Sequence, residues 1–200
     1  MKILFVNACP RGNESRTLQL AQAFLESVRC AAPDTEVVTH ELTRMGLLPF
    51  DAARLARRET VCDARNWDDP LVSAAVEFQA ADAVVIAAPY WDLSFPSILK
   101  IWVENMYVRN LTFYYENDHP VGLCRGRESI YITTAGSPIG ENDWGAMYMK
   151  AVLTTLGIPG FSSIRAEALD LETTDTEAVM AEASKRAVRA AQAFMQRIRM

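Results

Sequence analysis

The chain has 200 residues, the usual length of a single domain, and half of them are hydrophobic. With 22% charged residues, this composition supplies a full apolar core and excludes global disorder. The net charge of −5 argues against a nucleic-acid surface or a polybasic membrane contact, and no apolar run approaches the roughly 20 residues of a membrane span.

The amino end and the cysteines indicate the compartment. One lysine precedes the first apolar run, which is not the pattern of a signal peptide. Cys9, Cys30, Cys62 and Cys124 are scattered and form no C-x-x-C pair, which argues against a zinc site, an iron–sulfur cluster or a redox dithiol. We therefore expect a cytoplasmic protein with free thiols and no bound metal.

The first predicted elements are a buried strand over residues 3–6, a polar loop over 7–14 and a helix that Ser15 caps. Such a unit points the free N–H groups of the helix's first turn beyond the strand's carboxyl end, where they favour a phosphate. Arg16 and Thr17 add a guanidinium and a hydroxyl there. The loop lacks G-x-G-x-x-G and the P-loop pattern, which disfavours a Rossmann dinucleotide or ATP and leaves a monophosphate. The alternative is an ordinary strand-to-helix turn without a ligand.

A strand with one wetter face is predicted over residues 35–42, at an edge of the sheet. We expect His40 on the flank of this strand and without a catalytic role. The next segment, 43–68, is too long for a minimal connection and is interpreted as an insertion, with a short basic helix that Asp51 caps. A lid, a dimer arm and simple decoration are its three alternative roles. Its apolar residues favour burial against another part of the protein.

The continuous apolar run over residues 82–89 is typical of a central parallel strand that is buried on both faces. The remaining elements are predicted in this order: a helix over 70–81, a helix from Pro96, a long connection over 110–127, a strand over 128–134, a helix near 143–156, a strand near 162–169 and a helix over about 174–198. Five strands that alternate with five main helices predict an α/β fold, an open doubly wound parallel sheet with helices on both faces. We expect one domain, 1–200.

Three predicted loops emerge together at the carboxyl edge of this sheet, where ligands of doubly wound folds bind. The loop at 10–17 offers phosphate donors, and the loop at 89–95 offers aromatic surface and backbone amides. The small residues of the loop at 134–140 let backbone N–H groups approach a planar ligand closely. A phosphate at one end and a flat heteroaromatic ring at the other describe flavin mononucleotide, FMN.

Two stretches carry a resemblance to a known family. Residues 88–100 are similar to the pattern A-P-(M/L)-Y-(N/W)-x-x-x-(P/S)-x-x-L-K, and residues 111–117 with 120–123 resemble G-x-T-F-x-Y-x-x-x-x-P-x-G-L. The residues at 15–17 resemble a Ser-x-Ser phosphate loop. Over nearly its whole length, the chain resembles the FMN-dependent NAD(P)H azoreductase and quinone reductase family, of flavodoxin-like fold.

This resemblance implies roles for individual residues. Ser15, Arg16 and Thr17 would bind the FMN phosphate. Five consecutive residues would frame the isoalloxazine ring, largely through backbone groups: Pro89, Tyr90, Trp91, Asp92 and Leu93. Four residues of a turn would contact the pyrimidine end of the ring: Thr134, Ala135, Gly136 and Ser137. Phe113 and Tyr115 would lie near the substrate pocket, across the interface of a homodimer whose sites are built from both chains.

Three features depart from the family's pattern. Asp92 stands where the family often has asparagine, beside the reactive edge of the ring. A carboxylate there disfavours an anionic reduced ring unless it points away or is protonated. The family's S-R-G-G turn is Thr-Ala-Gly-Ser at 134–137, and the apolar pair Pro138-Ile139 replaces a histidine that often follows.

The activity that the resemblance implies is two-electron, ping-pong hydride transfer from NADH or NADPH to a quinone or an azo compound. Because the cofactor supplies the chemistry, no catalytic side chain is assigned, which fits a chain with only two histidines. We expect His119 to be a solvated loop residue. Two alternatives stay open: a flavodoxin-like FMN electron carrier that does not oxidise NAD(P)H, and a flavin-free module that binds a protein partner.

Overall fold

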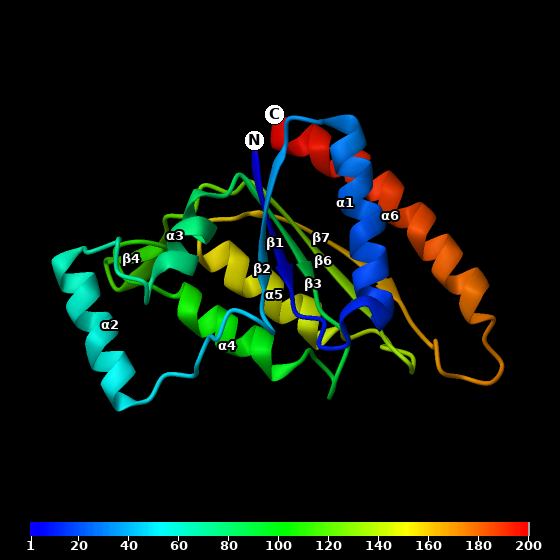
Figure 1. Cartoon of the computed structure of the whole chain (residues 1–200), viewed down its shortest axis with the longest axis horizontal. Coiled ribbons are helices and arrows are strands. Elements are labelled where there is room, and N and C mark those ends of the chain that lie inside the picture. The colour runs from blue at the N-terminus through cyan, green and yellow to red at the C-terminus, as the bar shows by residue number, and fades with distance from the viewer. Residues whose placement is uncertain (200) are drawn as a thin grey trace.

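A five-stranded parallel sheet runs through residues 1–199, the part of the chain that this computed structural model describes (Figure 1). Its strands are β1 (Lys2–Asn7), β2 (Glu36–Glu41), β3 (Ala83–Ala87), β6 (Glu128–Thr134) and β7 (Gly160–Ala166). Their spatial order is β2-β1-β3-β6-β7, so the winding reverses between β1 and β3. The predicted doubly wound sheet is confirmed, with β2 at an edge.

Helices cover both faces of the sheet (Figure 1). They are α1 (Arg16–Ala31), α2 (Ala52–Ala64), α3 (Ser73–Ala80), α4 (Ser97–Met106), α5 (Trp144–Thr155) and α6 (Thr176–Arg199), and a 3₁₀ turn, η1 (Gly12–Glu14), precedes α1. On one face α1 packs against α6, where the rings of Phe24 and Phe194 meet edge to face at 5.3 Å between centroids. The other face carries α3, α4 and α5.

The central strand β3 shows why the sheet lies between two layers of helices. Ala83, Val85 and Ala87 pack on the side of α1 and α6, whereas Val84 and Ile86 pack on the side of α3, α4 and α5. All five side chains are fully buried. Because neighbouring side chains of a strand point to opposite faces, an unbroken apolar strand requires helices on both.

The connection at 110–127 contains two strands that the sequence analysis did not predict. β4 (Phe113–Glu116) and β5 (His119–Gly122) form an antiparallel hairpin apart from the main sheet. Between them, Asn117 and Asp118 have φ of 48° and 64°, the left-handed pair that a two-residue hairpin turn requires. An Asn-Asp pair after an aromatic run is a recognisable signal of such a turn.

The segment at 43–68 holds α2, whose predicted cap is confirmed: the Asp51 carboxylate accepts a hydrogen bond from the Arg54 N–H at 2.8 Å. Val61 and Cys62 of α2 are buried in the core. The following helix was predicted from residue 70 but begins at Ser73. Its start is delayed because the Asp69 carboxylate accepts from the Leu71 N–H at 2.8 Å and holds a turn there.

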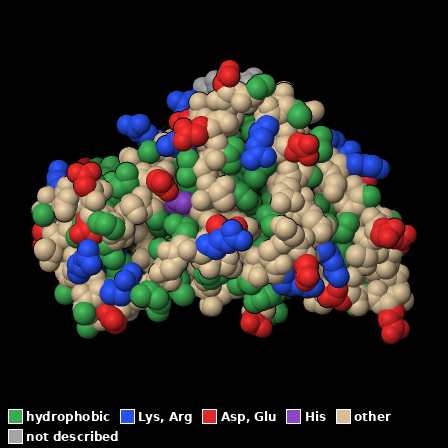
Figure 2. Space-filling model, in the orientation of Figure 1, with side chains coloured by type: hydrophobic (Ala, Val, Ile, Leu, Met, Phe, Trp, Pro, Cys, Tyr) green, Lys and Arg blue, Asp and Glu red, His purple; other side chains and the backbone are tan. Residues whose placement is uncertain are grey.

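Charge and apolar patterning agree with the composition. In Figure 2, acidic and basic side chains are interspersed over the visible face of the molecule. Among residues 1–199, no helix combines the length and the apolarity that crossing a membrane requires. No cluster of three or more potential metal-ligating side chains is found in the same range.

His40 is buried in the core, not on the strand's flank, which corrects the prediction. Its ring lies between α3 and α4, where Trp102 Nε1–H donates to His40 Nδ1 at 3.0 Å. Nδ1 therefore carries no proton, and the Nε2–H donates to the Glu77 carboxylate at 2.8 Å. Burial lowers the pKa of His40, and the hydrogen bond and charge of Glu77 oppose this shift.

This pKa shift predicts a loss of stability in acid. The unfolded chain binds a proton at His40 near pH 6.5, whereas the folded chain resists it, so the free energy of unfolding falls as the pH drops below about 6.5. One such group contributes at most about 1.4 kcal/mol per pH unit. Urea unfolding between pH 5 and 8 should show a shallower pH dependence for His40→Gln than for the unchanged protein.

His119 provides the matched control, because it is the other histidine of the chain and is exposed in β5. His119→Gln should keep the steep pH dependence. If His119→Gln flattened the profile and His40→Gln did not, the assignment of the acid sensitivity to the buried ring would be wrong.

Three of the four free cysteines are buried: Cys9, Cys62 and Cys124, whereas Cys30 is exposed on α1. Cys9 lies in the loop after β1, and its thiol donates a long hydrogen bond to the Ala87 carbonyl at 3.6 Å. Burial raises the pKa of Cys9 to about 11 and that of Cys124 to about 12. These thiols are therefore held protonated at neutral pH, and Cys9 serves as a buried packing residue.

Alkylation at pH 8 should thus modify one thiol quickly. A pKa rise of about two units lowers the thiolate fraction, and with it the rate of Cys9, about a hundredfold. Mass spectrometry of the labelled peptides should find Cys30 first, and Cys30→Ser should remove the fast phase. A fast phase that survives in Cys30→Ser but disappears in Cys9→Ser would contradict this assignment. Labelling in urea should modify all four thiols and so gives the total against which the fast phase is measured.

Candidate functional site

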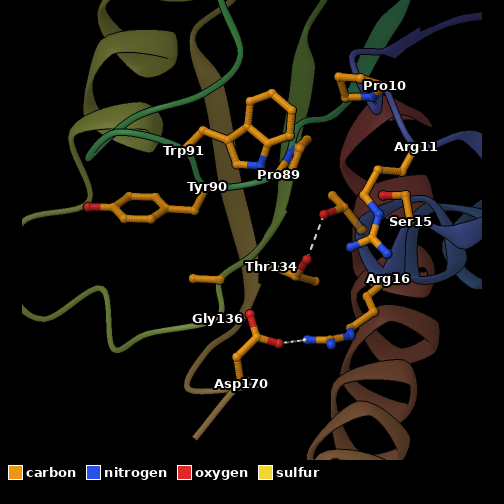
Figure 3. Close-up of a pocket in the computed structure, with 12 residues that line it drawn as sticks. Pro10, Arg11, Ser15, Arg16, Pro89, Tyr90, Trp91, Thr134, Gly136 and Asp170 are labelled. Carbon is orange, nitrogen blue, oxygen red and sulfur yellow. Dashed lines mark hydrogen bonds and ion pairs between the residues drawn. The ribbon is translucent and has the colours of Figure 1, made fainter.

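A cleft of about 190 Å³ opens beyond the carboxyl ends of β1, β3 and β6, at the point where the strand order reverses (Figure 3). The lining comes from the three predicted loops and from the segment after β7: Pro10, Arg11, Ser15, Arg16, Thr17, Pro89, Tyr90, Trp91, Thr134, Ala135, Gly136 and Asp170.

One end of the cleft is the amino end of α1. Ser15 is its N-cap, and the Ser15 hydroxyl oxygen accepts from the Leu18 N–H at 3.3 Å. The N–H groups of Arg16 and Thr17 come earlier in the first turn and have no acceptor among the described residues. Arg11 lies on the same side of the cleft as Ser15 (Figure 3). Two amides, a hydroxyl and a guanidinium therefore form an anion-binding end.

The Thr17 side chain has a different place from the one predicted. Its hydroxyl hydrogen-bonds the Thr134 hydroxyl at 2.7 Å, and both side chains are buried. This contact ties the first turn of α1 to the end of β6. We therefore expect Thr17 to contribute to anion binding through its backbone N–H and not through its hydroxyl.

Arg16 makes an ion pair across the cleft that the sequence analysis did not foresee. Its Nη1 lies 2.8 Å from Oδ1 of Asp170, in the segment that follows β7 (Figure 3). Asp170 and Arg11 are the two charged lining residues that sequence reasoning missed. Arg11 stood inside the predicted loop, but Asp170 had no local signal, and only the position of its loop at the carboxyl edge could have pointed to it.

The turn from Trp91 to Ser94 forms the opposite wall. Backbone bonds join Trp91 and Ser94 in both directions, and Asp92 and Leu93 have φ of 50° and 65°. Left-handed conformation costs about 1 kcal/mol for such residues and is typical of loops with a function. Asp92 and Leu93 lie at the tip of this turn, outside the lining, and Leu93 is 68% exposed.

Some backbone N–H groups of the two later loops hydrogen-bond to strand ends, and others remain available to a ligand in the cleft. The Tyr90 N–H donates to the Thr134 carbonyl, and the Ala135 N–H donates to the Ala166 carbonyl, each at 2.9 Å. Within residues 1–199, the N–H groups of Gly136 and Ser137 make no hydrogen bond. At this end of the cleft, these two N–H groups are therefore the backbone donors that can bind a ligand. The Ser137 side chain lies outside the lining.

Phe113 and Tyr115 are not brought to this cleft in the single chain. They lie on β4, in the hairpin whose second strand, β5, contacts α5. Their rings stack edge to face at 5.5 Å, and Tyr115 is 63% exposed. Their expected place at a site shared between two chains stays a prediction.

Comparisons with known proteins agree with this architecture. A model of the flavodoxin-like fold matches residues 1–191. FMN-dependent NADH:quinone oxidoreductase 2 of Clostridium acetobutylicum is 32% identical, and the FMN-dependent NADH:quinone oxidoreductase of Clostridium beijerinckii is 31% identical. Each alignment covers 96% of this chain and 99% of the relative.

Solved structures show the same fold. An azoreductase from Bacillus anthracis superposes with a TM-score of 0.87 at 21% identity, over 97% of this chain and 100% of that one. An FMN-dependent NADH-azoreductase from Bacillus anthracis, solved in complex with FMN, gives 0.84 at 24% identity, over 96% and 98%. The chain belongs to the flavodoxin-like family that includes the FMN-dependent NADH:quinone oxidoreductases.

Proposed function

We propose that this protein is an FMN-dependent NAD(P)H oxidoreductase that reduces quinones and azo compounds by two-electron, ping-pong hydride transfer. One observation carries the proposal: a single cleft joins an anion-binding helix end to a turn with free amides and an aromatic wall. The names of the relatives support FMN and a nicotinamide donor, NADH in particular.

The donor set at the amino end of α1 fits a phosphate. The Ser15 hydroxyl and the N–H groups of Arg16 and Thr17 surround one position at the positive end of the helix dipole. The Arg11 guanidinium adds a positive charge at this end. These groups would hold the FMN phosphate and so fix the cofactor's position.

The other end of the cleft fits a flat ring. Pro89, Tyr90 and Trp91 supply a wall, and Trp91 stays 43% exposed, so an incoming aromatic ligand can cover it. Bound FMN supplies the acceptance and donation of hydride. The amides of Gly136 and Ser137 would stabilise negative charge on the ring's pyrimidine side as preorganised dipoles. Asp92, at the tip of its turn, keeps its carboxylate out of the cleft lining.

Flavin binding tests the proposal directly. The purified protein should quench the fluorescence of added FMN on binding. Arg11→Gln should weaken FMN about tenfold, because a charge-assisted contact contributes roughly 1.5–3 kcal/mol when partly shielded. Arg125→Gln is the matched control. Arg125 is exposed just before the amino end of β6, whereas the cleft lies at the carboxyl ends of the strands, so this variant should bind FMN normally. Protein that ignores FMN would refute the proposal.

Anaerobic NADH or NADPH distinguishes the enzyme from an electron carrier. The enzyme should bleach bound FMN in a two-electron step without a lasting radical signal in electron paramagnetic resonance, and a quinone should restore the colour. Bound FMN that neither nicotinamide bleaches, or a persistent radical, would favour the carrier.

We also propose a homodimer, on the apolar surface that α4 and α5 expose. Two adjoining hollows share Lys100 and Tyr148 and run from the end of the Trp91–Ser94 turn to Tyr107. Trp144 and Met147 stand half-exposed along them. Exposed apolar surface of this extent is typical of an interface. A symmetric partner there is consistent with the expected place of Phe113 and Tyr115 at the site of the other chain.

Met147→Asp should convert such a dimer into a monomer, because it places a charge in the centre of the apolar surface. Light scattering after gel filtration gives the mass of each species. Val188→Asp is the control, since Val188 is an exposed apolar residue on α6 and should leave the mass unchanged. Unchanged Met147→Asp dimers would place the interface elsewhere.

The remaining expectations are part of the same proposal. We treat 1–200 as one domain in which 43–68 is an insertion, supported by the burial of Val61 and Cys62 in the main core. The cytoplasm is the proposed compartment, because four free thiols suit a reducing environment.

A further inference from the structure

The cleft contains a negative charge beside its anion-binding end, on a residue that lies against the turn at 134–137. Asp170 is the one acidic residue in its lining, and Arg11 and Arg16 are the basic ones. The Arg16 Nη1 atom lies 2.8 Å from Asp170 Oδ1, so this guanidinium is engaged across the cleft (Figure 3). Of the two basic side chains, Arg11 is left to face an incoming anion, and its own ion pair with Glu14 is long, at 3.8 Å.

Backbone bonds hold the main chain of Asp170 against the turn at 134–137, and the Arg16 ion pair holds its carboxylate. The Asp170 N–H donates to the Gly136 carbonyl at 2.9 Å, and the Leu169 N–H donates to the Ala135 carbonyl at 3.1 Å. A Cβ atom at Gly136 would lie 2.1 Å from Asp170 Oδ2, so a side chain at this position would displace the carboxylate from where it lies. The segment after β7 is therefore fastened to the turn at 134–137, and its carboxylate lies against that turn.

We propose that Asp170 sets the selectivity of the cleft between phosphorylated and unphosphorylated flavins. The carboxylate repels a phosphate dianion and also holds Arg16, so the Arg16–Asp170 pair adds no net charge to the cleft. FMN and riboflavin share the ring and the ribityl chain and differ in the phosphate alone. The ratio of their affinities therefore isolates the electrostatic effect of Asp170. This inference rests on the proposed function, since it takes a flavin as the ligand.

The test compares the dissociation constants of FMN and riboflavin, measured by fluorescence quenching at 0.15 M salt. Asp170→Asn keeps the shape of the side chain and removes the charge, so it should raise the preference for FMN about threefold to tenfold. Arg16→Gln should lower this preference by a similar factor. The double variant removes a neutral pair and should stay within about twofold of the unchanged protein.

Three further measurements sharpen the comparison. Glu172→Gln removes one negative charge from the same segment, at an exposed residue outside the cleft, and should leave the preference unchanged. Raising the salt to 1 M should shrink the differences among all variants, because it screens exposed charges. Thermal unfolding verifies that each variant is folded.

The inference is overturned if the unchanged protein binds FMN and Asp170→Asn leaves its preference for FMN equal or lower. A lower preference would show that Asp170 instead positions Arg16 for the phosphate. If none of the folded proteins binds either flavin, the proposed function itself fails, and that result is distinct from the first.

Discussion

The buried hydrogen bond between the hydroxyls of Thr17 and Thr134 is the contact on which the cleft depends. It joins the first turn of α1 to the carboxyl end of β6, across 117 positions of sequence. A buried hydroxyl left without its partner costs about 1–3 kcal/mol, so both threonines hold their elements in one relative position. The anion-binding end and the ring-binding end of the cleft are thereby kept at a fixed spacing, which suits a ligand with a phosphate and a rigid ring.

The loops that line the cleft are held in place because some of their backbone N–H groups hydrogen-bond to the ends of strands. Tyr90 and Ala135 donate to neighbouring strand ends, and these bonds fasten the loops after β3 and β6 to the sheet. The amides next to them, at Gly136 and Ser137, keep their donors free. Donors that are held in place before a ligand arrives need no reorganisation when charge develops on it. The same bonds that order the loops therefore also orient the donors that remain.

Features with a local signal were predictable from the sequence. The apolar run at β3 indicated a buried central strand, Ser15 was recognised as the cap of α1, and the three loops at the carboxyl edge followed from the alternation of strands and helices. The β4–β5 hairpin had a signal too, in Asn117 and Asp118, but the aromatic residues around it were interpreted as an irregular connection.

Features that depend on distant residues were not predictable. The sequence around His40 is typical of an edge strand with one solvent-exposed face. His40 becomes a core residue because α3 and α4 bring Glu77 and Trp102 to its ring. Asp170 lies 154 positions from Arg16, and nothing in either sequence neighbourhood marks them as partners. Yet this pair decides how much of the positive charge at α1 is left for a ligand. The loop sequence could therefore indicate that an anion binds here, whereas its strength of binding is a property of the folded cleft.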